Sequence, residues 1–143
     1  MTIKQISVFI ENRTGRLYDI THTLAMGGVN IRAFSVADTV DFGILRLIVD
    51  KPAQAVQVLK EGKFTVSETE VIAVRLGDQS GDLSHVLKVL LEDDISVEYG
   101  YAFVSHSVDS AMVILRVSDN NRAVQLFAKA GVEVMGEQMI EKL

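Results

Sequence analysis

The sequence has no cysteine and no tryptophan. Without cysteine the chain cannot form disulfides, thiolate zinc sites, iron–sulfur clusters or a cysteine nucleophile. Aromatic residues make up only 6% of the chain, so the core must be largely aliphatic. The apolar runs are too short for a membrane-spanning helix, and the first residues lack the apolar stretch of a signal peptide. We therefore expect an intracellular, cytoplasmic protein with no membrane partner.

Positive charge is also scarce. Lysine and arginine total 14 against 19 acidic residues, which gives a formal net charge of −5. No basic cluster stands out, and nucleic-acid binding needs a basic face that releases counterions. We expect no nucleic-acid partner. With 48% hydrophobic residues over 143 positions, the chain can fill one ordinary domain or two very small ones.

Motifs for catalysis and for metal binding are missing. His22, His85 and His106 lack the spacing of metal ligands and are expected on helix surfaces or partly buried. No G-x-S-x-G elbow and no glycine-rich nucleotide loop occurs. The carboxylate pairs Asp93-Asp94 and Asp38 with Asp41 are typical of solvated turns. We predict no catalytic residues, no metal and no cofactor, with a small ferredoxin-like enzyme as the least favoured alternative.

The second half of the chain repeats the first with a period of about 66 to 70 residues. Residues 6–10 match 72–76, residues 14–17 match 80–83, and residues 29–31 match 95–97. A period of this length indicates a duplicated small domain rather than a solenoid. We place the two repeats at residues 1–68 and 69–143.

Each repeat is predicted to have the order β-α-β-β-α-β. In the first, strands are expected at 6–10, 29–36, 43–49 and 64–68. One helix, closed by Gly27-Gly28, carries Leu17, Ile20 and Leu24, and the other starts near Pro52. In the second, strands are expected at 71–76, 95–104, 111–117 and 132–139, and the first helix carries Leu83, Val86, Leu87 and Leu90. The predicted fold class is α+β, with two ferredoxin-like units whose antiparallel sheets are covered on one face by helices.

The strand at 43–49 is apolar on both faces. Leu45, Leu47 and Val49 share one face, while Ile44 and Ile48 share the other. A sheet with one wet face alternates more cleanly, and exposed apolar patches mark interaction sites. Together with the similar strand at 111–117, this pattern predicts a homodimer that buries the second sheet face.

The segment from Asn12 to Leu17, followed by Gly28-Val29-Asn30-Ile31, resembles the ACT domain family, which consists of small regulatory modules that usually sense amino acids. The resemblance covers the whole chain as two tandem copies without an attached enzyme. Thr14 and Ser80 stand where the family usually has proline, and Ser96 replaces the asparagine of the second strand. The resemblance implies a site between two such units.

The residues expected at this site suit a zwitterionic ligand. The turn at Gly15 leads straight into a helix, whose amino end favours a carboxylate. An asparagine side chain offers both an acceptor and a donor without net charge. We therefore expect a free L-amino acid to bind a set formed by Asn12, Arg13, Thr14, Gly15, Arg16, Leu17, Asn30 and Ile31.

The equivalent set in the second repeat is expected to bind more weakly. Asp78 and Asp82 place negative charge where a carboxylate would enter. The full set is Asp78, Gln79, Ser80, Gly81, Asp82, Leu83, Ser96 and Val97. The favoured function is a non-catalytic amino-acid sensor that regulates a protein partner. The alternative is a regulatory interaction subunit with a vestigial pocket.

Overall fold

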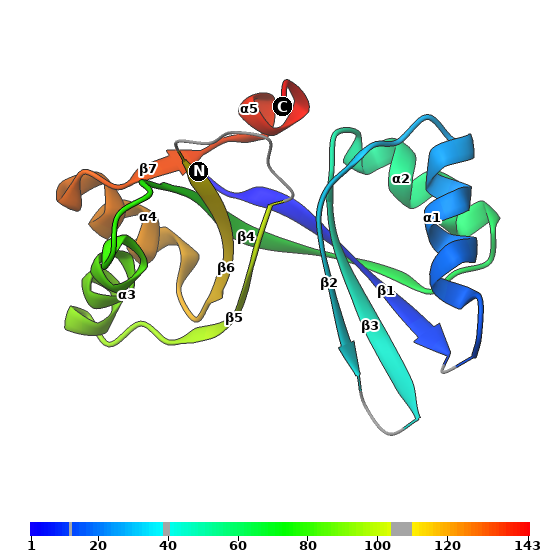
Figure 1. Ribbon diagram of the computed structural model, residues 1–143, viewed down its shortest axis with the longest axis horizontal. Coiled ribbons are helices and arrows are strands. Elements are labelled where there is room, and N and C mark those ends of the chain that lie inside the picture. The colour runs from blue at the N-terminus through cyan, green and yellow to red at the C-terminus, as the bar shows by residue number, and fades with distance from the viewer. Residues whose placement is uncertain (12, 39–40, 104–109) are drawn as a thin grey trace. The chain divides into compact units, whose positions relative to one another are not determined.

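The computed structural model describes residues 1–11, 13–38, 41–103 and 110–143. The chain forms two compact units (Figure 1). The N-terminal unit contains Lys4–Thr69 and Ile140–Leu143, and the C-terminal unit contains Met1–Ile3 and Glu70–Met139. Each unit therefore includes a short segment from the opposite end of the chain. No helix among the described residues is both long enough and apolar enough to cross a membrane.

The N-terminal unit is a sheet covered by two helices. Its elements are β1 (Ile3–Glu11), α1 (Arg16–Met26), β2 (Ile31–Asp38), β3 (Phe42–Val49), α2 (Pro52–Glu61) and the first part of β4 (Val66–Leu76). Strand β3 pairs antiparallel with β1 on one side and with β2 on the other. The register places Asp38 of β2 opposite Gly43, and Glu11 of β1 opposite Phe42. These pairs put the ends of three strands at the edge of the sheet where α1 begins.

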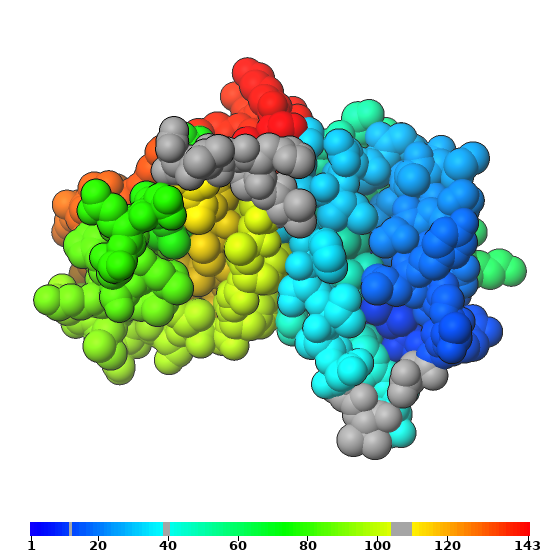
Figure 2. Space-filling view, viewed as in Figure 1, coloured from blue at the N-terminus to red at the C-terminus, as the bar shows by residue number. Residues whose placement is uncertain are grey.

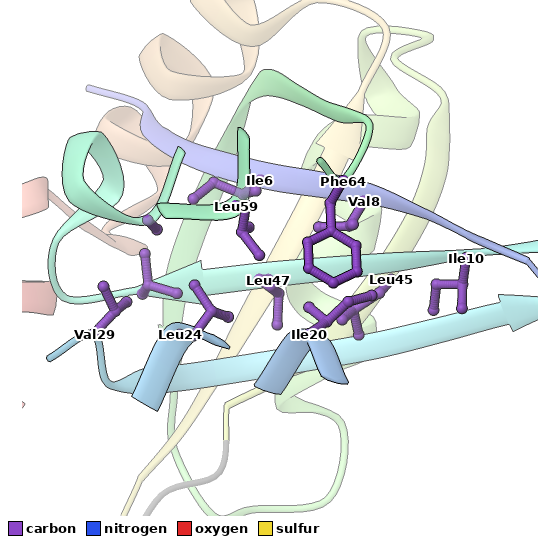
Figure 3. Packing of buried hydrophobic residues seen from close by; sticks show 12 residues of the cluster. Ile6, Val8, Ile10, Ile20, Leu24, Val29, Leu45, Leu47, Leu59 and Phe64 are labelled. Carbon is purple, nitrogen blue, oxygen red and sulfur yellow. The ribbon is translucent and has the colours of Figure 1, made fainter. Parts of the chain in front are cut away.

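Alternation along the strands builds the core of this unit. Ile6, Val8 and Ile10 of β1 point to one face, where they meet Leu45 and Leu47 of β3. The helices cover this face through buried aliphatic side chains, and the ring of Phe64 closes it (Figure 3). The buried residues of the two helices are Ile20, Leu24, Ala55 and Leu59. The core is nearly all aliphatic, as the composition predicts.

The C-terminal unit repeats the plan. It contains the second part of β4, α3 (Asp82–Glu92), β5 (Val97–Ala102), β6 (Ala111–Val117), α4 (Asn120–Ala130) and β7 (Glu133–Met135). Strand β6 pairs antiparallel with β4 and β5, and β7 pairs with β4. Val86 and Leu90 of α3 pack with Phe127 of α4 in its core. The predicted α+β class with two βαββαβ units is confirmed.

Two predicted strands differ from the structure. The expected strand at 132–139 is wrong, because β7 ends at Met135 and the helix α5 (Glu137–Glu141) follows Gly136. Ile140 is the buried residue of this helix. The strands expected at 64–68 and 71–76 are one continuous strand, β4, since no glycine or proline interrupts residues 66–76.

The helix ends confirm the predicted turns. Gly28 and Gly131 have φ of 72° and 73°, the left-handed conformation that closes a helix. Lys63 and Asp94 take the same role at φ 64° and 57° after the other two long helices. The pair Asp93-Asp94 is therefore a helix-end turn, as the sequence predicts.

The second sheet face of the N-terminal unit is covered only in part. Ile48 is 1% exposed, whereas Ile44 on the same face is half-buried. Phe9, which pairs with Ile44, and Phe42 are 45% and 42% exposed on this face. The homodimer expected through this face therefore stays a prediction.

An ion pair joins the end of α3 to α4. The guanidinium of Arg122 donates a hydrogen bond from Nε to Oδ2 of Asp93. This contact holds the pKa of the Asp93 carboxyl below its ordinary value. A carboxyl with a depressed pKa stabilises the fold above its unfolded-state pKa, and that contribution is lost as the pH falls through the folded-state value.

We predict that Asp93→Asn melts at a lower temperature than the wild type at pH 7. The difference should persist down to pH 5, shrink as the pH falls below the unfolded-state pKa of about 3.9, and disappear once the pH is below the lowered folded-state pKa of Asp93. Melting temperatures recorded from pH 7 to pH 2.5 test this. Glu92→Gln on the same helix is the control and should show no such convergence. A gap between Asp93→Asn and the wild type that stays constant over the whole range would refute the role of the ion pair.

Candidate functional site

Gly15 forms the turn that leads from β1 into α1. It is the residue before the first helical residue, and its φ of 89° lies in the left-handed region. A Cβ built on Gly15 would meet no atom within 4 Å, so glycine is required by the backbone and not by crowding. The turn is also exposed on the surface of the unit. The backbone conformation thus fixes the direction in which α1 begins.

The amino end of α1 lacks a side-chain cap. Its Ncap residue is Gly15, which has no side chain to accept from the first turn. In contrast, Asp119 caps α4, where its Oδ1 accepts from the Arg122 amide at 3.0 Å. Open amide groups and the positive end of the helix dipole favour an anion. The start of α1 can therefore receive a carboxylate from outside.

A cavity of about 160 Å³ lies beside this turn in the N-terminal unit. Three predicted residues, Arg13, Gly15 and Leu17, line it. The remaining lining residues come from the ends of the strands, and they are Ile10, Glu11, Val36, Asp38 and Gly43. The sequence analysis missed Glu11 and Asp38, and the β2–β3 register, which joins Asp38 to Gly43, is the signal that would have found them.

The charges around the cavity have both signs. Arg13 lies 3.9 Å from Glu11 between Nε and Oε2, and both side chains are more than half exposed. Asp38 adds a second carboxylate to the wall. A pocket with one guanidinium and two carboxylates can contact both ends of a zwitterion.

Two of the predicted residues do not line the cavity. The guanidinium of Arg16 lies 4.6 Å from the centre of the Phe64 ring, and its Nη1 is 3.9 Å from Asp19. Thr14 is exposed and is not part of the lining. Asn12 lies outside the described residues. Arg16 therefore stabilises the unit through its stacking on Phe64 rather than through the cavity wall.

Asn30 and Ile31 lie at the other end of the N-terminal unit. They start β2, whereas the cavity is at the end of β2, and α1 spans about 16 Å between the two ends (Figure 1). The amide of Asn30 donates to Asp50 Oδ1 at 2.8 Å, and its carbonyl accepts from the Asp50 amide at 3.1 Å. Its side chain takes no part in these two bonds. A site with both Arg13 and Asn30 thus needs contributions from two copies of this chain, because the second repeat has Ser96 in place of Asn30.

The second repeat has the same turn with different chemistry. Gly81 precedes α3 with a φ of 91°, and a Cβ there would also meet no atom within 4 Å. Asp82 takes the place of Arg16, and its Oδ2 accepts from the Gln79 amide at 3.0 Å. A carboxylate of the chain itself therefore occupies the turn.

A wider cavity of about 410 Å³ lies beside the second turn, in the C-terminal unit. Its wall contains Asp82 and His85, and an ion pair of 3.6 Å between Arg75 and Glu133. Of the predicted second set, only Asp82 lines this cavity, while Asp78, Gln79, Ser80 and Gly81 form the exposed turn. Ser96 and Val97 start β5 at the opposite end, where Ser96 pairs with Ser118 as Asn30 does with Asp50.

The histidines match the prediction where they can be placed. His22 and His85 are exposed on α1 and α3, and His106 lies outside the described residues. His22 stacks on Tyr18 with the ring centres 5.3 Å apart. Within the described ranges, no three His, Asp or Glu side chains come together as metal ligands would.

Comparison with solved structures shows similar chains. A protein from Bacteroides thetaiotaomicron is 34% identical, with a TM-score of 0.93 over 100% of this chain and 98% of that chain. The regulatory subunits of aspartate kinase from Thermus thermophilus and Thermus flavus are each 13% identical, with TM-scores of 0.64 and 0.60. Each of these matches covers 89% of this chain and 91% of the subunit, and at such identity shows the fold alone.

The search of curated proteins finds no match. One family model, by contrast, matches residues 1–143. The two repeats, the two glycine turns and the matched order of elements agree with that result. The chain belongs to the family described as the ACT domain pair.

Proposed function

We propose that this chain is a sensor that binds a free L-amino acid beside the turn at Gly15 and carries no catalytic activity. The observation that carries the proposal is the uncapped amino end of α1, which opens beside a cavity with charges of both signs. Membership of a regulatory family and the likeness of the fold to aspartate kinase regulatory subunits support the regulatory part.

The charges give the ligand an orientation. Its carboxylate meets the amide groups at the start of α1 and the guanidinium of Arg13. Its ammonium group meets Glu11 and Asp38, which line the same cavity. The volume of about 160 Å³ is small beside the roughly 300–1,000 Å³ of pockets for drug-sized ligands. A single amino acid suits that size.

Asn30 joins the site from a second copy of this chain, because the second repeat has Ser96 in its place. Asp50 holds the Asn30 backbone through two hydrogen bonds and leaves its exposed side chain available. Asn12 belongs to the proposed set by its place in the sequence and lies outside the described residues. The ligand would then contact two copies of the chain at once. Its binding would change how the copies associate, and this change would act on a regulated protein partner.

The second repeat binds the same ligand more weakly under this proposal. Asp82 accepts a backbone hydrogen bond inside its turn and repels an incoming carboxylate. We place the protein in the cytoplasm, in contact with free amino acids. The alternative function, a regulatory interaction subunit with a vestigial pocket, predicts no amino-acid ligand at all.

Gly15 and Gly81 offer a matched pair of variants. Both have φ near 90° and open space at Cβ, so Gly15→Ala and Gly81→Ala should lose similar stability, about 1–2 kcal/mol each. A thermal-shift screen of the twenty L-amino acids identifies the ligand, since a hundredfold excess over Kd adds about 2.7 kcal/mol. In titration calorimetry, Gly15→Ala should bind that ligand at least about tenfold more weakly, and Gly81→Ala should bind normally.

No stabilisation by any amino acid would favour the vestigial-pocket alternative. Equal weakening by both glycine variants would mean that the ligand does not use the first turn selectively. The D-enantiomer of the ligand serves as the control for specificity, because it cannot direct both charged groups and its side chain as the L form does.

A second matched pair tests the contribution of the β2 start. Asn30→Ala removes a side chain that takes no part in the backbone hydrogen bonds with Asp50. Ser96→Ala removes the side chain at the matching position of the second repeat. We expect Asn30→Ala to weaken binding by about 1.5–3 kcal/mol, the value of a hydrogen bond to a charged group. Ser96→Ala should leave the main site unchanged. Full affinity in Asn30→Ala, measured by the same calorimetry, would remove Asn30 from the site.

A further inference from the structure

The cavity beside the turn at Gly81 is large enough for a small organic molecule. It encloses about 410 Å³, and pockets for such ligands hold roughly 300–1,000 Å³. Helix α3 contributes Asp82 and His85 to the wall. The link between α4 and β7 contributes Val132 and Glu133. Figure 2 shows α3 in green at the surface of the C-terminal unit, with the orange segment that follows α4 beside it. We call this space the α3–α4 cavity.

Backbone geometry matches this cavity to a definite place in the first repeat. Arg16 and Asp82 are each the first residue of their helix after a left-handed glycine. Phe64 and Val132 each donate a backbone hydrogen bond to the carbonyl five residues earlier, at 3.0 and 2.9 Å, where the second helix of the repeat ends. Arg16 and Phe64 of the first repeat therefore correspond to Asp82 and Val132 of the second.

The first repeat fills the corresponding space with its own side chains. The guanidinium of Arg16 lies 4.6 Å from the centre of the Phe64 ring. The Arg16 side chain is only 18% exposed, so the unit encloses most of it. In the second repeat, the shorter side chains of Asp82 and Val132 leave this space open. The α3–α4 cavity is thus the space that an arginine and an aromatic ring occupy in the first repeat.

The charge of the wall differs between the repeats as well. Asp82 places a carboxylate where the first repeat has the guanidinium of Arg16. Glu133, the residue after Val132, adds a second carboxylate, and Arg75 forms an ion pair with it at 3.6 Å. Two carboxylates therefore face one guanidinium in this wall. The second repeat lacks the enclosed cation of the first and has a wall that attracts one.

We propose that the α3–α4 cavity binds a small free molecule through its guanidinium group, which takes the place that the Arg16 side chain has in the first repeat. Asp82 receives this group. The hydrogen bond from the Gln79 amide uses Oδ2 of Asp82 at 3.0 Å. A carboxylate has about four lone-pair sites on its two oxygens, so Asp82 can also accept from a guanidinium, whose planar fork fits a carboxylate.

A metal ion suits this wall less well. In the part of the chain that the structure describes, no three acidic or histidine side chains come together as ligands. A ligand with a carboxylate close to its cation is disfavoured too, because Asp82 and Glu133 repel it. The site lies in the other unit from the amino-acid site at Gly15 and does not depend on it.

Agmatine is the probe, because it has a guanidinium and an ammonium group and no carboxylate. In titration calorimetry of the full chain, we expect one agmatine to bind per chain. Asp82→Asn keeps an oxygen for the Gln79 amide and removes the charge, so it should weaken agmatine binding at least about tenfold. Asp78→Asn, in the same exposed turn but outside the cavity wall, is the matched control and should bind as the wild type does.

A double variant restores the arrangement of the first repeat. Asp82→Arg combined with Val132→Phe places a guanidinium and a ring where Arg16 and Phe64 lie. This variant should fill the cavity and abolish agmatine binding, and a thermal melt establishes that it is folded. Gly15→Ala should bind agmatine normally, which separates this proposal from the proposed amino-acid site.

Three results would overturn the proposal. They are no agmatine binding at millimolar concentration, full affinity in Asp82→Asn, and loss of binding in Asp38→Asn, which would place the cation in the first cavity. Acetyl-L-argininamide presents a guanidinium as an arginine of a protein does, and it should bind no more tightly than agmatine. Tighter binding of this blocked arginine would assign the cavity to a protein partner and overturn the small-molecule source. If the double variant fails to fold, Asp82→Asn decides.

Discussion

The left-handed backbone at Gly15 is the constraint on which the candidate site depends. Because the residue before α1 is a glycine at φ 89°, no side chain can cap the helix, and its first amide groups stay open. The same turn directs the helix away from the strand end, where Glu11 and Asp38 line the cavity. A capped start, such as Asp119 provides for α4, would fill the position that a ligand carboxylate needs.

The two repeats keep one scaffold and differ in chemistry. Gly15 and Gly81 have nearly the same φ angle, and Asn30 and Ser96 each accept a backbone hydrogen bond from the matching residue, Asp50 or Ser118. At the turns, however, Arg16 stacks on Phe64 while Asp82 folds back onto Gln79. On the first helices, Thr21 and Ala25 correspond to Leu87 and Leu91. The first repeat thus has an open turn and the second a leucine-rich helix face, a difference that fits ligand binding by the first.

Local patterns predicted most of the fold, because alternation and glycine turns act over a few residues. The strand cores at Val8 and Leu47 and the helix ends at Gly28 and Gly131 follow from such patterns. Non-local effects were not predictable. The burial of Ile48 and the helix after Gly136 depend on which surfaces meet in three dimensions. Glu11 and Asp38 were missed for the same reason, since only the strand register brings them to the turn.

The central claim is that an amino-acid ligand binds at the start of α1. An ¹⁵N–¹H correlation spectrum recorded during titration with the ligand found by thermal shift tests it most directly. The account predicts that the amide signals of Arg13 to Leu17 shift most, because these groups face the ligand carboxylate. The equivalent signals of Gln79 to Leu83 should shift little at the same concentration. Large shifts confined to the second turn, or spread over neither turn, would contradict the claim.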